Sequence, residues 1–172
     1  MVKKVVIVVA VVLLCVIVFG HCYISLPYEH TVNATKIDAE GNRIGNAEIT
    51  LNGAKKASLF REDVLSVQVD SVDGAPGFEV KSAQYEQHIG EDYLHSNFVT
   101  DDIGDLVDSI LNEDEIAQAK SYNYHVCISK DFDQWLISVS VNGEPKVYYM
   151  WSVSGNKTYE QLLEYFAEEL PL

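Results

Sequence analysis

Two side chains able to bind a metal or to form a nucleophilic pair stand two residues apart in the C-terminal half of the sequence. His125 and Cys127 belong to a segment in which Tyr122, Tyr124 and Val126 alternate with other residues, a pattern typical of a β-strand. Successive side chains of a strand point to opposite faces, so the imidazole and the thiol are expected to point the same way. Imidazole and thiolate are ligands of Zn²⁺, and a thiol beside an imidazole is also the arrangement of cysteine nucleophiles.

A working site at this place needs more than two side chains. A metal site takes further protein ligands, and a nucleophilic pair takes an acid that orients the imidazole. The sequence offers His88 and His95, but no spacing places them beside His125 and Cys127. We therefore predict no catalytic residues, no cofactor and no metal, because a strand face covered by neighbouring structure is the simpler interpretation. If a metal does bind, His125 and Cys127 are the candidate ligands.

Acidic residues cluster in two further places. Asp101, Asp102 and Asp105 begin a helical segment, and Asp131 and Asp133 lie in a connection between strands. Neither cluster has the ligand spacing, the glycine and the closing glutamate of a calcium-binding EF-hand loop. Turn and helix-capping interactions account for these carboxylates without an ion.

The candidate binding residues lie on two surfaces. Tyr148 and Met150 alternate with residues predicted to be buried, so they form a surface patch if no helix covers their face of the strand. Asp105 and Asp108 are the exposed acids of the acidic helical segment. Both tryptophans follow the aliphatic residues in the strand alternation, which indicates core packing rather than a sugar-binding platform.

The elements that position these residues are predicted from hydrophobic periodicity. Alternating apolar residues and turn-forming residues predict a strand-rich segment over 31–99 and a three-stranded antiparallel meander over 122–153. Apolar residues at helical spacing predict amphipathic helices over 102–120 and 158–170, the second beginning with the capping box Thr158–Gln161. We therefore predict an α+β fold, with one domain of antiparallel strands and two amphipathic helices in α-β-β-β-α order in its C-terminal half.

The N-terminus carries an apolar run over 5–19, which follows two lysines. A helix continued over 5–26 has the length of a transmembrane helix, about 30 Å. Because all 26 acidic residues follow the run, we expect residues 1–4 in the cytoplasm and one acidic extracytoplasmic domain over 28–172. The predicted localisation is a single-pass cell-membrane protein with a signal anchor, and a cleaved signal peptide with a secreted domain is the alternative. In this plan the chain resembles small envelope proteins of Gram-positive bacteria, in architecture alone.

Composition limits the partners of this domain. The 26 acidic residues outnumber the 12 basic ones and give a formal net charge of −14, which repels nucleic acid. Apart from Cys15 and one further cysteine near the apolar run, the domain has only Cys127, so no internal disulfide is predicted. Asn33 and Asn156 begin N-glycosylation acceptor motifs, which apply in a eukaryotic secretory route.

These observations lead to three hypotheses on function. We expect a membrane-anchored, non-catalytic binding or interaction domain of the cell envelope, whose partner is a protein or a cell-wall component. The first alternative is a metal-dependent enzyme that uses His125 and Cys127. The second is a structural assembly subunit, which predicts self-association and no ligand.

Overall fold

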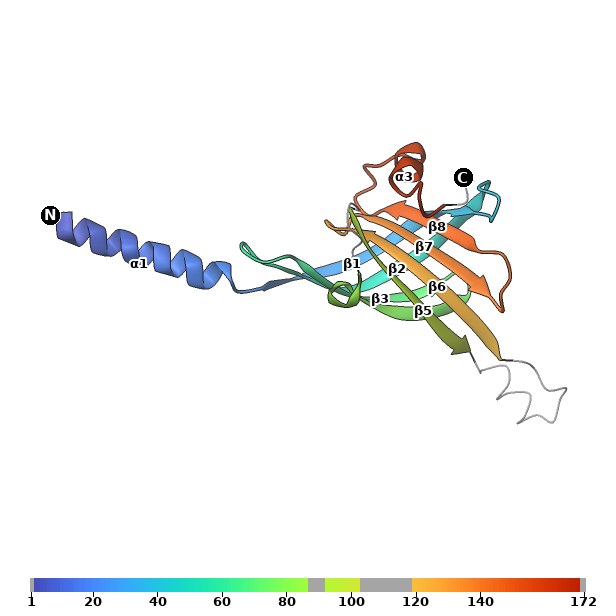
Figure 1. Ribbon diagram of the computed structural model, residues 1–172, viewed down its shortest axis with the longest axis horizontal. Coiled ribbons are helices and arrows are strands. Elements are labelled where there is room, and N and C mark those ends of the chain that lie inside the picture. The colour runs from blue at the N-terminus through green and yellow to red at the C-terminus, as the bar shows by residue number, and fades with distance from the viewer. Residues whose placement is uncertain (1, 87–91, 103–118, 171–172) are drawn as a thin grey trace.

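The computed structural model describes residues 2–86, 92–102 and 119–170 (Figure 1). In chain order its elements are α1 (Val2–Gly20), β1 (Ile24–Ile37), β2 (Arg43–Ala57), β3 (Val64–Val72), β4 (Ala75–Lys81), a 3₁₀ turn (Ser82–Gln84), β5 (Tyr93–Asp102), β6 (Lys120–Ser129), β7 (Gln134–Val141), β8 (Val147–Ser152) and α3 (Tyr159–Tyr165). Strands thus dominate the described part of the chain.

All the described strands belong to one antiparallel sheet with the order β4-β3-β2-β1-β8-β7-β6-β5. Strands β1 to β4 pair in succession, as do β5 to β8, and the two runs join where Thr35–Ile37 of β1 pairs with β8. The turn between β3 and β4 consists of Asp73 and Gly74, with φ angles of 52° and 85°. Positive φ at both central residues is what a two-residue hairpin turn requires, and Asp-Gly is one of the pairs that meets this requirement.

The sheet curves so strongly that its two edges approach each other (Figure 1). The ring of Phe78 on β4 lies 5.0 Å from that of Phe98 on β5 and 4.8 Å from that of Tyr124 on β6. The Tyr124 hydroxyl donates to the carbonyl oxygen of Pro76 at 2.7 Å, which ties β6 to β4. The inner face of this nearly closed sheet holds the main hydrophobic core, in which both tryptophans are buried as predicted.

The C-terminal segment covers part of the outer face of the sheet (Figure 1). Helix α3 begins with the predicted capping box: Gln161 N–H donates to the Thr158 hydroxyl, and Thr158 N–H donates to the Gln161 side chain. Its apolar residues and those of the following turn bury a second, smaller core against the sheet. The members of this outer core are Ile37, Tyr93, Cys127, Leu136, Tyr148, Met150, Leu162, Phe166 and Leu170.

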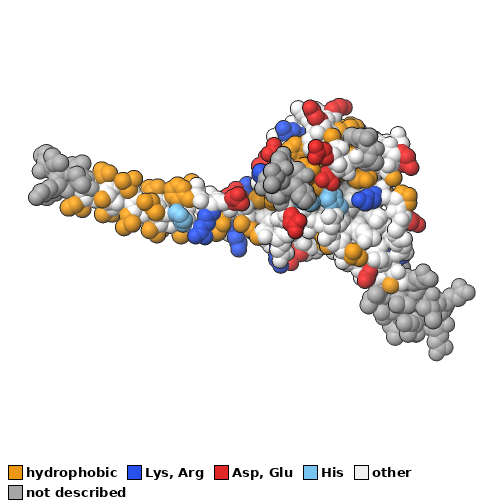
Figure 2. Space-filling view, in the orientation of Figure 1, with side chains coloured by type: hydrophobic (Ala, Val, Ile, Leu, Met, Phe, Trp, Pro, Cys, Tyr) orange, Lys and Arg blue, Asp and Glu red, His pale blue; other side chains and the backbone are white. Residues whose placement is uncertain are grey.

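Helix α1 extends away from the sheet, and exposed hydrophobic side chains follow it from Ile7 to Phe19 (Figure 2). It ends at Gly20, whose carbonyl oxygen accepts hydrogen bonds from the backbone N–H of Phe60 and from the Ser58 hydroxyl, at 3.1 and 2.9 Å. A Cβ atom at Gly20 would lie 2.1 Å from the Phe60 ring, so any larger residue there would displace this exposed ring. The β2–β3 connection therefore fixes the end of the helix.

Among the residues that the structure describes, no helix is long and apolar enough to cross a membrane. The predicted transmembrane helix and signal anchor over 5–26 are therefore wrong, and so is the predicted single-pass localisation at the cell membrane. The prediction needed the helix to continue to Leu26 to reach about 30 Å. Instead, the chain is already in β1 from Ile24, which pairs with Ala57 of β2.

The predicted α+β fold with two amphipathic helices is also wrong, because the described chain is mainly one antiparallel sheet. Most of the predicted helix over 102–120 lies outside the described residues, and its two ends belong to β5 and β6. The helix predicted over 158–170 ends at Tyr165 and gives way to turns. Strands β2, β3 and β4 lie within the predicted strand-rich segment 31–99, whereas β1 begins before it at Ile24 and β5 continues past it to Asp102.

Candidate metal centre

Three metal-binding side chains from two distant parts of the chain meet on the outer face of the sheet. His125 and Cys127 come from β6, and Glu169 comes from the turn that follows α3. The Nε2 atom of His125 lies 2.8 Å from Oε2 of Glu169 and 3.0 Å from Sγ of Cys127. All three donor atoms lie within 4.8 Å of one another, so an ion placed between them can reach each one.

Strand pairing fixes the imidazole. In the β5–β6 register Asn97 lies opposite His125 and His95 lies opposite Cys127, so these four side chains share the outer face. Oδ1 of Asn97 lies 2.6 Å from Nδ1 of His125. An amide oxygen can only accept a hydrogen bond, so in this arrangement Nδ1 carries the proton. In the neutral ring Nε2 then presents its lone pair to the cluster.

The packing of the C-terminal segment fixes Glu169. Phe166 and Leu170 on either side of it are buried in the outer core, and the backbone N–H of Glu169 donates to the Phe166 carbonyl oxygen at 3.0 Å. The hydroxyl of Tyr93, on β5, donates to Oε1 of Glu169 at 3.0 Å. One carboxylate oxygen is thus held by the sheet, while the other faces His125.

Burial and the Glu169 carboxylate act on the imidazole in opposite directions. Burial lowers the pKa of His125 and the positive charge of Lys146 lowers it further, whereas the Glu169 carboxylate raises it. Nε2 of His125 lies at hydrogen-bond distance, 2.8 Å, from Oε2 of Glu169, so a proton on this nitrogen satisfies the pair. A cation between the two atoms would take the place of that proton.

The donor set indicates which cations fit. Nitrogen, sulfur and oxygen donors together are typical of Zn²⁺ and its neighbours, whereas Ca²⁺ and Mg²⁺ take oxygen ligands. Three protein ligands with a fourth position open is the arrangement of catalytic rather than structural zinc sites. Asn97 on the imidazole and Tyr93 on the carboxylate occupy the places of the outer hydrogen-bond partners that orient metal ligands.

The alternative chemistry of a cysteine nucleophile fits less well. Cys127 has no exposed surface, and a reactive thiolate must reach its substrate. The Glu169 carboxylate also approaches the same imidazole nitrogen as the thiol. Asn97 holds the opposite nitrogen, as the orienting group of a cysteine–histidine pair does, so the burial of the thiol is what argues against this chemistry.

The sequence identified two of the three donors and missed the third. Glu160, Glu164 and Glu168 on the same segment are exposed, as helical spacing predicts. Glu169 follows Phe166 by three residues and therefore falls on the buried stripe, where an acid is out of place. An acidic residue at a position expected to be buried is the feature of the sequence that could have identified Glu169 as a donor. Of the two other histidines considered as ligands, His95 lies with its ring 6.0 Å from that of His125, and His88 is outside the described residues.

The other candidate residues lie elsewhere. Tyr148 and Met150 are buried beneath the C-terminal segment, so the uncovered face on which their binding role depended is absent from the described surface. Asp105 and Asp108 are outside the described residues. In the β6–β7 turn Asp131 accepts from the Ser129 hydroxyl, and Asp133 accepts from the Ser152 hydroxyl at 2.8 Å. These hydrogen bonds are the turn interactions expected for acids without an ion.

The sequence and the structure were compared with known protein families, curated proteins and solved structures. None of them matches this chain.

Proposed function

We propose that this chain is a metal-binding protein that holds one Zn²⁺-class ion between His125, Cys127 and Glu169. The convergence of three unlike donor atoms on one point, within 4.8 Å of one another, carries the proposal. The binding hypothesis that relied on Asp105 and Asp108 concerns residues outside the described chain. The metal hypothesis is the one that the described geometry supports best.

The donors need only a small movement to accommodate the ion. Tetrahedral zinc with bonds of about 2.0–2.3 Å separates nitrogen from oxygen by about 3.3 Å and nitrogen from sulfur by about 3.6 Å. The corresponding distances at His125 are now 2.8 and 3.0 Å. These two separations therefore widen by roughly half an ångström, and Sγ of Cys127 and the Glu169 oxygen, which lie within 4.8 Å of each other, come to about 3.6 Å apart. Side-chain torsions can supply movements of this size.

The ion has a path to solvent. The side chains of His125 and Glu169 are 13% and 21% exposed, whereas Cys127 is buried. A cavity of about 260 Å³ borders His125 and is lined partly by polar side chains, among them Asn97, Asn123, Ser138 and Lys146. A metal with three protein ligands could complete its coordination with water or a small ligand from this side.

The experiment uses the full chain, stripped of metal with a chelator and then titrated with Zn²⁺ and Co²⁺. At a free zinc concentration of 100 Kd, binding stabilises the native state by about 2.7 kcal/mol. For a chain of this size that raises Tm by roughly 5–11 °C. Co²⁺ bound to Cys127 should add a thiolate charge-transfer absorption band. The absence of both the thermal shift and the absorption band would refute the proposal.

Variants assign the ligands. His125→Ala, Cys127→Ser and Glu169→Gln should each weaken zinc binding by at least tenfold, since even outer-shell changes cost that much. Glu168→Gln is the matched control, because Glu168 is the neighbouring acid and is exposed. If Glu168→Gln weakens binding as much as Glu169→Gln does, the ion binds through diffuse negative charge rather than at this site.

A further inference from the structure

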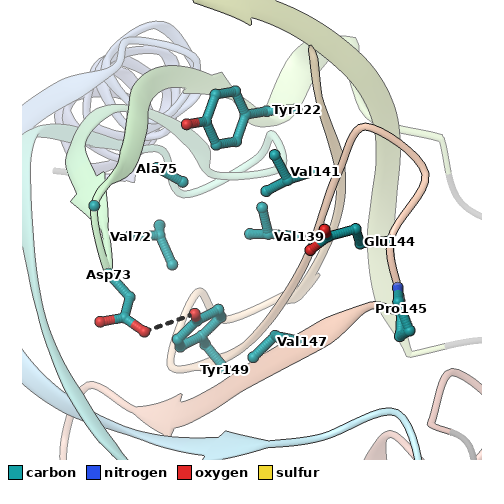
Figure 3. Close-up of a pocket in the computed structure, with 11 residues that line it drawn as sticks. Val72, Asp73, Ala75, Tyr122, Val139, Val141, Glu144, Pro145, Val147 and Tyr149 are labelled. Atoms are coloured by element: carbon teal, nitrogen blue, oxygen red, sulfur yellow. Dashed lines mark hydrogen bonds between the residues drawn. The ribbon is translucent and has the colours of Figure 1, made fainter. Parts of the chain in front are cut away.

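A second cavity, unrelated to the metal centre, opens at one end of the curved sheet (Figure 3). It has a volume of about 250 Å³ and lies between the β3–β4 turn and the β7–β8 connection. Val139, Tyr122 and Tyr149, which belong to the main core, form part of its wall. The cavity therefore gives access from the surface to the inner face of the sheet.

The wall of this cavity is mostly hydrocarbon. Val72, Ala75, Val139, Val141 and Val147 line it with aliphatic side chains. Such a wall favours an apolar ligand, because contact with it removes apolar surface from water. The volume is below the range of about 300–1,000 Å³ of ordinary ligand pockets, so the ligand must be small.

The charges of the lining are all negative. Asp73 and Glu144 are its only ionisable carboxylates among the described residues, and no basic side chain lines it. Asp73 accepts a hydrogen bond from the Tyr149 hydroxyl at 3.1 Å and forms an ion pair with Lys36, whose ammonium group also lies 5.9 Å from the centre of the Tyr149 ring. Glu144 enters from the opposite side, and its carboxylate points toward Val139 (Figure 3).

The positions of Asp73 and Glu144 have different structural explanations. Asp73 is accounted for by the hairpin turn, where its positive φ favours Asp, Asn or Gly. Only the backbone of Glu144 takes part in the β7–β8 connection, where its N–H donates to the Val141 carbonyl oxygen at 2.8 Å. Glu144 is exposed and its side chain borders the cavity, where the carboxylate can contact the cationic end of a ligand.

We propose that this cavity binds a small molecule with an apolar body and a protonated amine. The body lies against the valines of the wall, and the ammonium group lies at the rim beside Glu144, because Asp73 already pairs with Lys36. The formal net charge of −14 favours the approach of such a cation and disfavours that of an anion.

The test compares three probes of nearly equal size: hexylammonium, hexanol and hexanoate at neutral pH. Each is titrated into the full chain in chelator, and amide resonances of the Val72–Ala75 turn and the Val139–Val147 segment are followed by NMR. We expect hexylammonium to bind tightest, hexanol more weakly and hexanoate weakest. Equal affinities for hexylammonium and hexanoate overturn the proposal, as do shifts confined to other segments or no binding by any probe.

Two variants separate charge from shape. Glu144→Gln should weaken hexylammonium binding by about two- to fivefold, the range of a solvent-exposed ion pair, and leave hexanol binding unchanged. Val141→Leu, which partly fills the cavity, should weaken both probes. Glu48→Gln, at an exposed acid on β2, is the matched control. If Glu48→Gln lowers hexylammonium binding as much as Glu144→Gln does, the amine responds to net charge and the rim acid has no specific role.

Discussion

Replacing Phe166 with alanine tests whether the outer core creates the metal centre. Phe166 has no exposed surface, and its ring lies 5.8 Å from that of Tyr93, which holds Glu169. Truncating a buried phenylalanine to alanine costs about 3–5 kcal/mol. Because Phe166 packs in the outer core rather than inside the sheet, we expect this loss of free energy to weaken mainly the docking of the C-terminal segment onto the sheet.

Weaker docking of the C-terminal segment lowers the apparent affinity for zinc by an amount that can be calculated. If only a fraction of molecules holds Glu169 in place, the apparent Kd equals the intrinsic Kd divided by that fraction. The variant Phe166→Ala therefore raises the apparent Kd for zinc by at most about 100- to 4,000-fold, since each 1.4 kcal/mol is a factor of ten. Linkage requires the converse too, so saturating zinc should protect the segment of Phe166→Ala from proteolysis.

The measurement is a zinc titration against a competing chelator, combined with limited proteolysis of the C-terminal segment. Fluorescence of Trp135 and Trp151, which are buried in the main core, reports whether the sheet stays folded. Phe60→Ala is the control, because Phe60 is 52% exposed and lies near α1 rather than near the metal centre. A folded Phe166→Ala protein with unchanged zinc affinity and unchanged proteolysis would contradict the assignment of Glu169 to the outer core.

Two further predictions follow from single contacts. Tyr93→Phe removes the hydrogen bond to Glu169 and keeps the ring, so we expect zinc affinity to fall about 10- to 100-fold by titration; an unchanged affinity would mean that the hydroxyl does not orient the carboxylate. The ion pair with Lys36 lowers the pKa of Asp73 in the folded protein. The charged Asp73 therefore stabilises the fold at pH values above the ordinary carboxyl pKa, and this stabilisation is lost as the pH falls through the lowered pKa. Urea unfolding should show Asp73→Asn less stable than the parent by up to about 1 kcal/mol at pH 7, with the difference vanishing in acid; a difference that persists at low pH would point to a cause other than charge.

The strands of the C-terminal half were predictable because each has one buried face. On β6 the inner residues Tyr124, Val126 and Ile128 alternate with outer ones, and a period of two identifies such a strand without knowledge of its partners. The overall fold was not predictable in the same way. Which strands close on each other depends on the contact of Phe78 with Phe98, and a periodicity says nothing about such distant pairs.

The N-terminal error has a related cause. Ile24 and Leu26 are apolar and follow an apolar run, so the local pattern predicts that the helix continues through them. Its strand conformation comes from pairing with residues 55–57, which are about 30 positions away in sequence. A local pattern cannot distinguish an apolar stretch in a helix from one in a long hairpin when the deciding partner is distant.

The metal centre was half predictable for the same reason. His125 and Cys127 share one strand face, and spacing alone brings them together. Asn97 reaches the imidazole only through the β5–β6 register, and Glu169 only through the docking of a short segment after α3. Neither contact leaves a repeat in the sequence, although an acid on a buried stripe was a visible anomaly.

The division of β6 between two faces makes the proposed metal binding separable from the stability of the sheet. Its inner side chains belong to the main core, and changes there are expected to destabilise the sheet. His125 on the outer face is only partly buried, and it contacts Glu169 across a surface that the short C-terminal segment covers. Removal of the imidazole therefore alters the donor set without opening a cavity in the main core. A loss of metal binding in His125→Ala can for that reason be attributed to chemistry, provided that the tryptophan fluorescence of the main core is unchanged.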